Sequence, residues 1–183
     1  MAILDTDVKA LPEGTFALDP AHSSVAFEVK HAGIAVVPGR FTVISGTLTG
    51  GESPALEGVA DIASVTTFDE QRDGHLASPD FFDAQRFPQA TFRSSSFEQL
   101  GDGTVRVIGD LTLKGVTKEI ELTGSVAGPA TDPWGNERIA LELRGVVDRN
   151  DFGVKWNAPL PGGGFLLPDD VRIAIDVSAV KGA

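Results

Sequence analysis

Hydrophobic and polar residues alternate over much of the chain with a period of two, which is typical of a β-strand that buries one face. The pattern is clearest near the C-terminus, where Val171, Ile173, Ile175 and Val177 alternate with mostly polar residues. Four other segments alternate as clearly and three alternate more weakly, namely residues 25–29, 105–113, 120–126 and 139–143, and then 41–48, 59–67 and 91–97. Together they predict eight strands, and residues 15–18 predict a short extra one.

The segments between these strands are short and rich in turn-forming residues. Gly50-Gly51, residues 101–103, Lys114-Gly115 and Gly128-Pro129 each fall between two alternating runs. Lys114-Gly115 also has the length of a two-residue hairpin turn. Many strands joined by short turns favour an all-β fold, either an antiparallel sandwich or a barrel, in a single domain.

One region, residues 66–88, breaks the alternation and carries helix signals. Thr67 and Glu70 have the spacing of a capping box. Ser78-Pro79 has the residue types that begin a second helix, and Pro88 would end it. We therefore predict a short helical insert of two turns around residues 67–85, which covers one end of a barrel or one sheet edge.

The composition narrows the classes of function. The chain has 183 residues, with 15 Lys and Arg against 26 Asp and Glu, and its net charge is −11. This acidic excess argues against binding to nucleic acid or to anionic lipid surfaces, because both depend on clustered Lys and Arg. The absence of cysteine excludes disulfides, thiolate metal sites and cysteine nucleophiles.

The N-terminal residues predict neither an export signal nor a membrane span. Asp5, Asp7, Lys9 and Glu13 interrupt any apolar run at this end. A secretory signal needs ~7–15 apolar residues and a membrane-spanning helix needs about 18. We therefore expect a cytoplasmic protein that does not span a membrane.

Several segments resemble the YceI-like family, and the most specific of them is RDGHLASPDFFDAQRFPQATFRS at residues 72–94. The others are residues 18–33, 39–50, 109–122 and 151–156. The resemblance implies a lipocalin-like antiparallel barrel of eight strands that binds a polyisoprenoid lipid. We expect this barrel domain over residues 14–183, after an N-terminal extension over residues 1–13. Relatives are often dimeric, so a monomer and a homodimer both stay open, and some members of the family are exported.

The interior of an eight-stranded barrel is either filled by side chains or wide enough for one ligand. The chain has 11 Phe and no Tyr, and an apolar pocket with aromatic walls suits an isoprenoid tail. The candidate contacts for such a tail are Phe41, Phe68, Leu76, Phe81, Phe82, Phe87, Phe92 and Trp156. Ordinary core packing is the alternative for each of them.

Three glycines, Gly109, Gly124 and Gly145, lie on the apolar face of their predicted strands. A glycine that faces the interior adds no volume, so the three together predict a groove for a chain-like ligand. The alternative is that they mark bends or bulges of the barrel.

Arg72, Asp73 and His75 form a polar cluster within the helical insert. Arg72 and His75 could donate to a pyrophosphate or quinone head group, with Asp73 holding Arg72 or orienting His75. The alternative is a local salt bridge that fixes the insert. His31 shares the strand parity of Phe27, so it is a further candidate for the head group or else a structural histidine.

Two further segments carry weaker signals. Asp19 predicts a turn before the first strong strand, with His22 as its partner. Residues 157–167 are rich in Gly and Pro and predict a mobile loop. That loop is either a lid over the barrel mouth or a plain surface excursion.

Three functions follow from these signals. The first is a carrier that holds a long-chain polyisoprenoid or an isoprenoid-quinone-type lipid in the lumen, with no cofactor and no catalysis. The second is a metal-dependent enzyme that uses His22, His31 and His75, although their spacing matches no compact metal motif. The third is a stress-related interaction protein with a packed barrel and an exposed apolar patch. We predict the carrier, because the chain contains no phosphate-binding loop or hydrolase motif.

Overall fold

The computed structural model describes residues 11–182, so most of the predicted N-terminal extension lies outside the described residues. In chain order the elements are β1 (Thr15–Leu18), η1 (Pro20–His22), β2 (Ser24–His31), β3 (Ala35–Phe41), β4 (Ile44–Thr49), β5 (Ala55–Asp61), η2 (Ile62–Ser64), β6 (Val65–Thr66), α1 (Glu70–Ala77), β7 (Gln89–Gln99), β8 (Thr104–Leu113), β9 (Val116–Thr131), β10 (Glu137–Asp148), η3 (Arg149–Phe152) and β11 (Asp170–Lys181).

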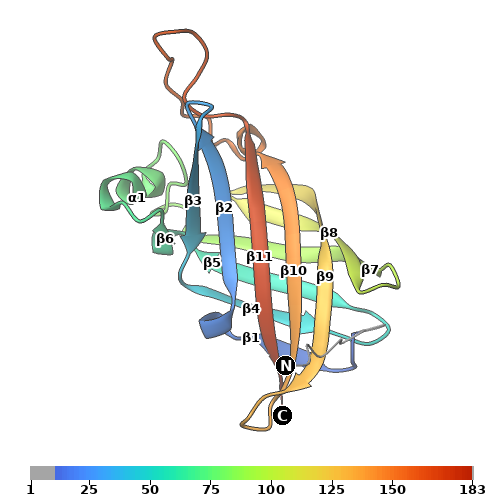
Figure 1. Cartoon of the computed structure of the whole chain (residues 1–183). Helices are drawn as coiled ribbons and strands as arrows, with labels where there is room; N and C mark the ends of the chain where they lie inside the picture. The colour runs from blue at the N-terminus through green and yellow to red at the C-terminus, as the bar shows by residue number, and fades with distance from the viewer. Residues whose placement is uncertain (1–10, 183) are drawn as a thin grey trace.

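Eight of the strands close into an antiparallel barrel. They follow the order β1-β4-β5-β7-β8-β9-β10-β11, and β1 closes the ring because it pairs with both β4 and β11. The sequence-based prediction of an all-β, eight-stranded barrel with a short helical insert is therefore confirmed. In Figure 1 the β9–β10 turn marks the lower end of the barrel, and the β2–β3 turn lies near its upper end.

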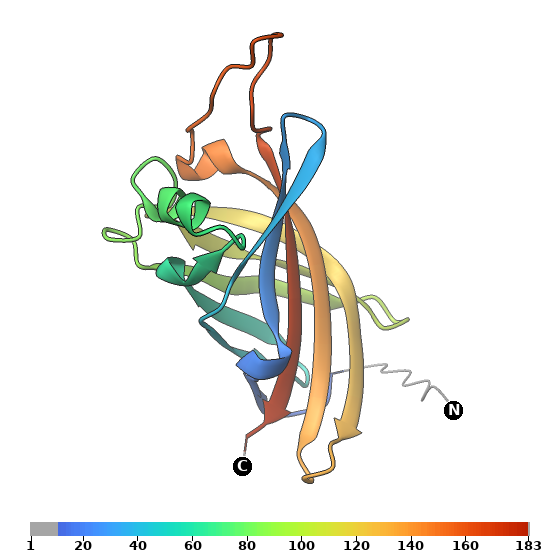
Figure 2. The same ribbon diagram turned by 60° about the vertical axis from the view of Figure 1, so that its left-hand side comes forward.

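Strands β2, β3 and β6 form a branch on the barrel wall. The edge of β11 pairs with β1 over Ala179–Lys181 and with β2 over Arg172–Asp176. From β2 the branch continues to β3, and the lower end of β3 pairs with β6. Along the edge of β11, the wall is thus continued by β2 above and by β1 below. α1 lies beside this branch (Figure 2).

Inward-facing side chains fill the lower end of the barrel. The most completely buried of them are Phe16, Leu48, Val105, Val107, Leu122, Ile139, Leu141 and Leu143. Each such side chain contributes about 1.5–3 kcal/mol relative to an exposed one. Leu11 also belongs to this cluster, and its N–H donates to Gln99 Oε1 at 2.8 Å. The packing of the barrel therefore begins before residue 14.

The helical insert contains one helix instead of the two predicted turns. The side chain of Asp69, not that of Thr67, caps α1 by accepting a hydrogen bond from the Arg72 N–H at 2.8 Å. After α1 the chain forms hydrogen-bonded turns as far as Phe87, so the second helix start at Ser78-Pro79 was a wrong prediction. Among residues 11–182, no helix is long and apolar enough to cross a membrane.

The structure confirms one of the predicted turns and corrects another turn and the bounds of predicted strands. Lys114-Gly115 forms the β8–β9 hairpin turn, with φ values of 51° and 76° that suit a two-residue turn. Gly128-Pro129 is no turn, because it lies inside β9 next to an irregularity in the register with β10. Residues 41–48 are not one strand, since β3 ends at Phe41 and β4 begins at Ile44. Residues 59–67 are not one strand either, since η2 separates the end of β5 from β6.

Candidate functional site, an apolar cavity in the upper barrel

A cavity of about 390 Å³ occupies the upper half of the barrel. Its volume lies within the range of ~300–1,000 Å³ that is usual for small-molecule sites. The walls come mainly from β2, β3, β5, β7, β8 and β11 and from the segments around α1 and η3, and β1, β4, β9 and β10 contribute one residue each. Most of the lining is aliphatic or aromatic, for example Val25, Phe27, Leu111, Ile173 and Ile175. The arrangement suits an apolar guest.

Three phenylalanines join the branch strands to the insert at this cavity. Phe27, Phe41 and Phe82 have ring centroids 5.9, 6.4 and 6.0 Å apart, in tilted and edge-on arrangements. The Phe27 ring lies directly over Gly39, and a side chain at residue 39 would collide with it. Gly39 therefore allows β2 and β3 to hold an aromatic wall without widening the sheet.

A second aromatic cluster brings together residues from two distant segments. His75 lies edge-on to Phe81 at 5.0 Å and to Trp156 at 4.9 Å between ring centroids. His75 Nε2 is 2.9 Å from Asp80 Oδ2. The carboxylate that orients His75 is therefore Asp80, and the expected role of Asp73 as its partner is wrong.

Thr67 is the partner that Arg72 and Asp73 share. Arg72 Nε donates to Thr67 Oγ1 at 2.7 Å and its Nη2 donates to the Thr67 carbonyl at 2.9 Å. Both the N–H and the hydroxyl of Thr67 donate to Asp73 Oδ1 at 2.6 Å. Burial acts to raise the pKa of Asp73, but the hydrogen bonds from Thr67 outweigh it and hold that pKa below its usual range. Arg72 and Asp73 thus fix the segment that leads into α1, which is the structural role predicted as the alternative. They do so through hydrogen bonds with Thr67 and not through a salt bridge with each other.

Arg149 is a buried cation on the cavity wall that the sequence analysis did not identify. Its guanidinium donates to the carbonyls of Pro168, Val154 and Trp156 at 2.8, 2.8 and 2.9 Å. The carboxylate of Asp169 is 3.8 Å away and exposed. Arg149 thereby ties η3 to the segment that follows it and to the start of β11.

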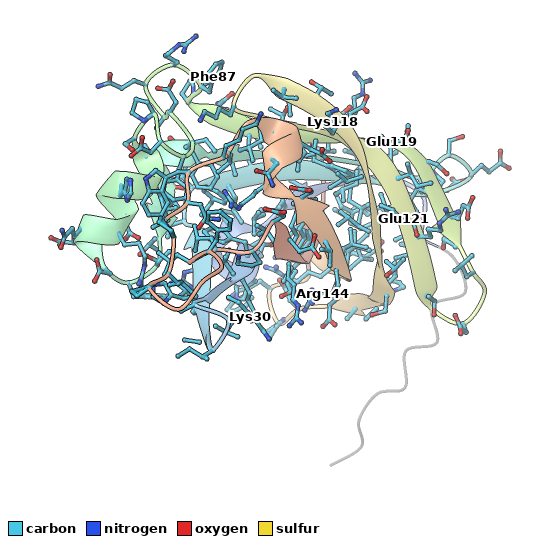
Figure 3. The ribbon with its side chains drawn as sticks, turned by 90° about the horizontal axis from the view of Figure 1, so that it is seen from above. Lys30, Phe87, Lys118, Glu119, Glu121 and Arg144 are labelled. Carbon is cyan, nitrogen blue, oxygen red and sulfur yellow. The ribbon has the colours of Figure 1, made fainter. Side chains whose placement is uncertain are left out.

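The structure places nine of the predicted contacts on the cavity wall and six elsewhere. The nine are His31, Phe41, Arg72, His75, Leu76, Phe81, Phe82, Phe92 and Trp156. Asp73 is among the six because it points to Thr67. Phe68 is 70% exposed and lies under the Arg40 guanidinium, 5.5 Å from its ring centroid. Phe87 lies on the outer side of the molecule, against Gly115 (Figure 3).

Gly109, Gly124 and Gly145 are the other three of these six residues. The groove that they were predicted to form is not present. A Cβ at Gly109 would meet the Arg93 carbonyl at 2.5 Å, and one at Gly145 would meet Leu122 Cδ2 at 2.6 Å. At Gly124 it would collide with the Glu142 carbonyl. The positions are filled by neighbouring strands and supply no room for a ligand. The alternative reading, sharp bends of the barrel, agrees with this close approach.

The histidines do not gather into one site. His31 and His75 line the cavity, whereas His22 Nδ1 is 2.8 Å from Asp19 Oδ2 outside it. The predicted pairing of Asp19 with His22 is therefore confirmed. Within residues 11–182, no three His, Asp or Glu side chains are placed to hold a metal ion.

Residues 157–167, which the sequence predicts to be a loop, form a hairpin-like finger with internal backbone hydrogen bonds. Pro159 and Phe165 form a β-bridge, and Leu166 N–H donates to the Ala158 carbonyl at 2.8 Å. The side chain of Asn157 clamps the base by hydrogen bonds to both N–H and C=O of Leu167. Leu166 and Leu167 reach back to line the cavity.

Known proteins with similar sequences and folds identify the family to which this architecture belongs. Protein YceI of Escherichia coli is 39% identical over 138 residues, which are 73% of this chain and 72% of that protein. The crystal structure of a Campylobacter jejuni YCEI protein has 30% identity and a TM-score of 0.69, and the match covers 91% of this chain and 97% of that one.

A polyisoprenoid binding domain from Saccharophagus degradans has the same fold. It shares 17% identity with a TM-score of 0.68, and the match covers 91% of this chain and 98% of that one. The model of the YceI-like domain matches residues 16–179, which is nearly the whole barrel with its branch and insert. The chain therefore belongs to the YceI-like domain family.

Proposed function

We propose that this protein is a carrier that holds a polyisoprenoid or isoprenoid-quinone-type lipid in the cavity and performs no chemistry on it. The observation that supports the proposal most strongly is the cavity of about 390 Å³ with its almost wholly apolar wall. Burial of each methylene contributes ~0.8 kcal/mol before ordering costs, so a branched hydrocarbon tail gains affinity along its length. The Saccharophagus degradans domain with the same fold is described as polyisoprenoid binding.

The polar groups on the wall favour an uncharged head group. Arg72 is hydrogen-bonded to Thr67, and Arg149 donates to three backbone carbonyls. His75 is paired with Asp80. Because these three groups already have partners, a pyrophosphate bound to them would have to displace existing hydrogen bonds. The remaining cation of the lining, Lys30, is exposed to solvent. A quinone or an alcohol needs only one or two donors, and His31 at the upper end of the cavity is suited to supply one.

The two alternative functions have less support. A metal-dependent enzyme would need the three histidines together, and His22 lies outside the cavity that His31 and His75 line. An interaction protein with a fully packed barrel does not match the hollow upper half.

The test is to fill the cavity with a side chain. Gly58 on β5 lines the cavity, and a Cβ there would have only the Ser45 carbonyl near it, at 3.8 Å. Gly58→Leu should therefore fold and occupy part of the ligand volume. Overpacking of this kind costs ~1–3 kcal/mol, so we expect about a fivefold or greater loss of bound lipid. The measurement is mass spectrometry of the organic extract from protein purified without detergent.

Ala127→Leu is the matched control, because it adds the same bulk on the exposed face of β9. Ala90→Leu on β7, the strand that pairs with β5, repeats the test at a second position of the cavity wall, should Gly58→Leu be poorly folded. Wild-type protein and Ala127→Leu should carry a long-chain lipid in similar amounts. Equal lipid content in Gly58→Leu, or no lipid in any of the proteins, would contradict the proposal.

A further inference from the structure

The upper end of the molecule carries two segments without any charged residue. They are residues 31–37, at the β2–β3 turn, and residues 157–167, the finger, and neither contains Asp, Glu, Lys or Arg. We call them together the tip. The rest of the chain carries all of the charged residues, including the 26 acidic ones. Figures 1 and 2 show both segments projecting at the same end of the barrel.

The two segments of the tip are joined to each other and to the cavity. Ala32 N–H donates to the Leu166 carbonyl at 2.8 Å, which ties the β2–β3 turn to the finger. His31, Leu166 and Leu167 line the upper end of the cavity. The tip is therefore continuous with the proposed lipid site through these three residues.

Large apolar side chains project from the tip into solvent. Ile34 is 89% exposed and Phe165 is 66% exposed, and Val36 beside them is half exposed. Such side chains gain none of the free energy of burial on folding, and a group of them marks a surface that a partner can cover. The internal hydrogen bonds of the finger hold Phe165 in this position.

We propose that the tip inserts Ile34 and Phe165 into the surface of a phospholipid bilayer and so holds the upper end of the cavity against the membrane. A projecting tip with few apolar side chains suits a fluid bilayer, which adapts to its shape. A stable protein interface needs ~20–30 residues a side, which is more than the 18 residues of the two segments. Membrane binding by the tip is a property separate from lipid carriage. It rests on the proposed function only in that a lipid carrier needs to exchange its ligand with a membrane.

The charges below the tip predict which bilayers bind. Lys30 and Lys155 are exposed close in sequence to the two segments. Asp151, Asp169 and Asp170 are also exposed within a few residues of the finger. Lys30 lies at the periphery in the view from above (Figure 3). Attraction to anionic lipid is thus not expected, in agreement with the acidic composition. Insertion of apolar side chains should drive binding, which should therefore depend little on salt.

The experiment is sedimentation of the full chain with phosphatidylcholine vesicles. The double variant Ile34→Ser, Phe165→Ser removes the two most exposed apolar groups of the tip and should lower vesicle partitioning about tenfold or more. Trp134→Ser is the matched control, because Trp134 is 81% exposed in the β9–β10 turn at the opposite end. The control should bind like the wild type.

Three results would overturn the proposal. They are absence of wild-type binding to phosphatidylcholine vesicles, an equal loss in Trp134→Ser, and binding that requires added phosphatidylglycerol and disappears in salt. A double variant that turns a wild-type dimer into a monomer without affecting vesicles would assign the tip to a second copy of this chain instead.

Gly58→Leu separates this proposal from the carrier function. It leaves the tip unchanged, so its vesicle binding should equal that of the wild type even if it carries no lipid. The tip double variant, conversely, should still bind added farnesol in detergent-free buffer. Loss of vesicle binding in Gly58→Leu would contradict the assignment of docking to the tip.

Discussion

At the residue scale, Arg149 shows how one buried charge can organise a wall of the cavity. Three backbone carbonyls depend on its guanidinium, and a buried acceptor without a donor costs ~1–3 kcal/mol. We expect Arg149→Met, which keeps the aliphatic length, to lower the free energy of unfolding by about 2–4 kcal/mol. Urea unfolding followed by circular dichroism measures this change.

Arg144→Met provides the control for Arg149→Met. Arg144 lies on the same strand-to-turn segment, but its ion pair with Asp176 is exposed on the outer face (Figure 3). Pairs of that kind contribute ~0–1 kcal/mol, so the loss should stay below about 1 kcal/mol. Similar losses for the two variants would show that burial of Arg149 has no special energetic role.

Residues on the cavity wall differ in how far the sequence could predict them. Phe41 and Phe92 lie on alternating segments, and Phe81 and Phe82 lie in the specific motif of the insert, so composition and pattern pointed to them. Phe87 carries the same apolar signal but packs outside against Gly115. The difference depends on the path of the turns after α1, which follows from tertiary hydrogen bonds and not from local pattern.

The roles of Arg149 and of the inward-facing glycines could not be predicted from the sequence. Arg149 stands among Asp148, Asn150 and Asp151, a context that resembles an exposed turn. Nothing in that local context shows that the carbonyls of Val154, Trp156 and Pro168 converge on its side chain. Likewise, the close approach of β10 to Gly124 depends on strand pairing, so strand parity alone could not distinguish a groove from a bend.

At the element scale, strands with clear alternation were predicted and strands without it were not. β8, β10 and β11 contain the predicted alternating segments. β3 reads AVVPGRF, in which apolar residues run together and Pro38 argues against a strand. Pro38 is tolerated because the upper part of β3 is an edge that pairs only with β2. β3 was therefore missed where the edge position relaxes the usual pattern, although its partner β2 was predicted.

Arg138 connects elements that are far apart in the chain. Its guanidinium pairs with Asp19, next to η1, and with Asp132 in the β9–β10 turn, each at 2.8 Å. The hydrogen bond from Arg138, followed by that from His22, lowers the pKa of Asp19 from 3.8 to about 2. Arg138, followed by Asn136, also holds the pKa of Asp132 far below its usual range.

The ion pairs of Arg138 predict how the free energy of unfolding falls as the pH is lowered. A carboxyl whose pKa is lower in the folded than in the unfolded state stabilises the fold fully above its unfolded value. That contribution is lost as the pH falls through the folded value, so for Asp19 the window runs from about pH 4 to pH 2. The urea midpoint of the wild type should fall across this window, and that of Arg138→Met should fall less steeply.

Arg93→Met is the control for the pH series. Its ion pair with Glu57 is exposed on both sides, so removing it should leave the slope of the wild type unchanged. An Arg138→Met protein with the same slope as the wild type between pH 4 and pH 2 would show that the ion pairs of Arg138 do not cause the fall in the free energy of unfolding.

At the scale of the whole molecule, the barrel has a solid lower end and a hollow upper end. The lower end contains the cluster of buried aliphatic side chains around Leu122 and Leu141. The upper end has the cavity, with β2, β3 and α1 as part of its enclosure. Side chains that face a void lack partner atoms and their dispersion contacts. Local opening should therefore need less free energy at the upper end than at the lower end.

A ligand in the cavity should change this difference in a defined way. It would supply the missing contacts and stabilise only the states in which the cavity is closed. Using farnesol, a short isoprenoid alcohol, as the probe, we expect slower amide hydrogen exchange in β2, β3 and α1. The lower halves of β9 and β10 should not change, and Gly58→Leu should show no response to farnesol. Hydrogen exchange with mass spectrometry measures each segment, and protection spread evenly over the barrel would argue that farnesol binds outside the cavity.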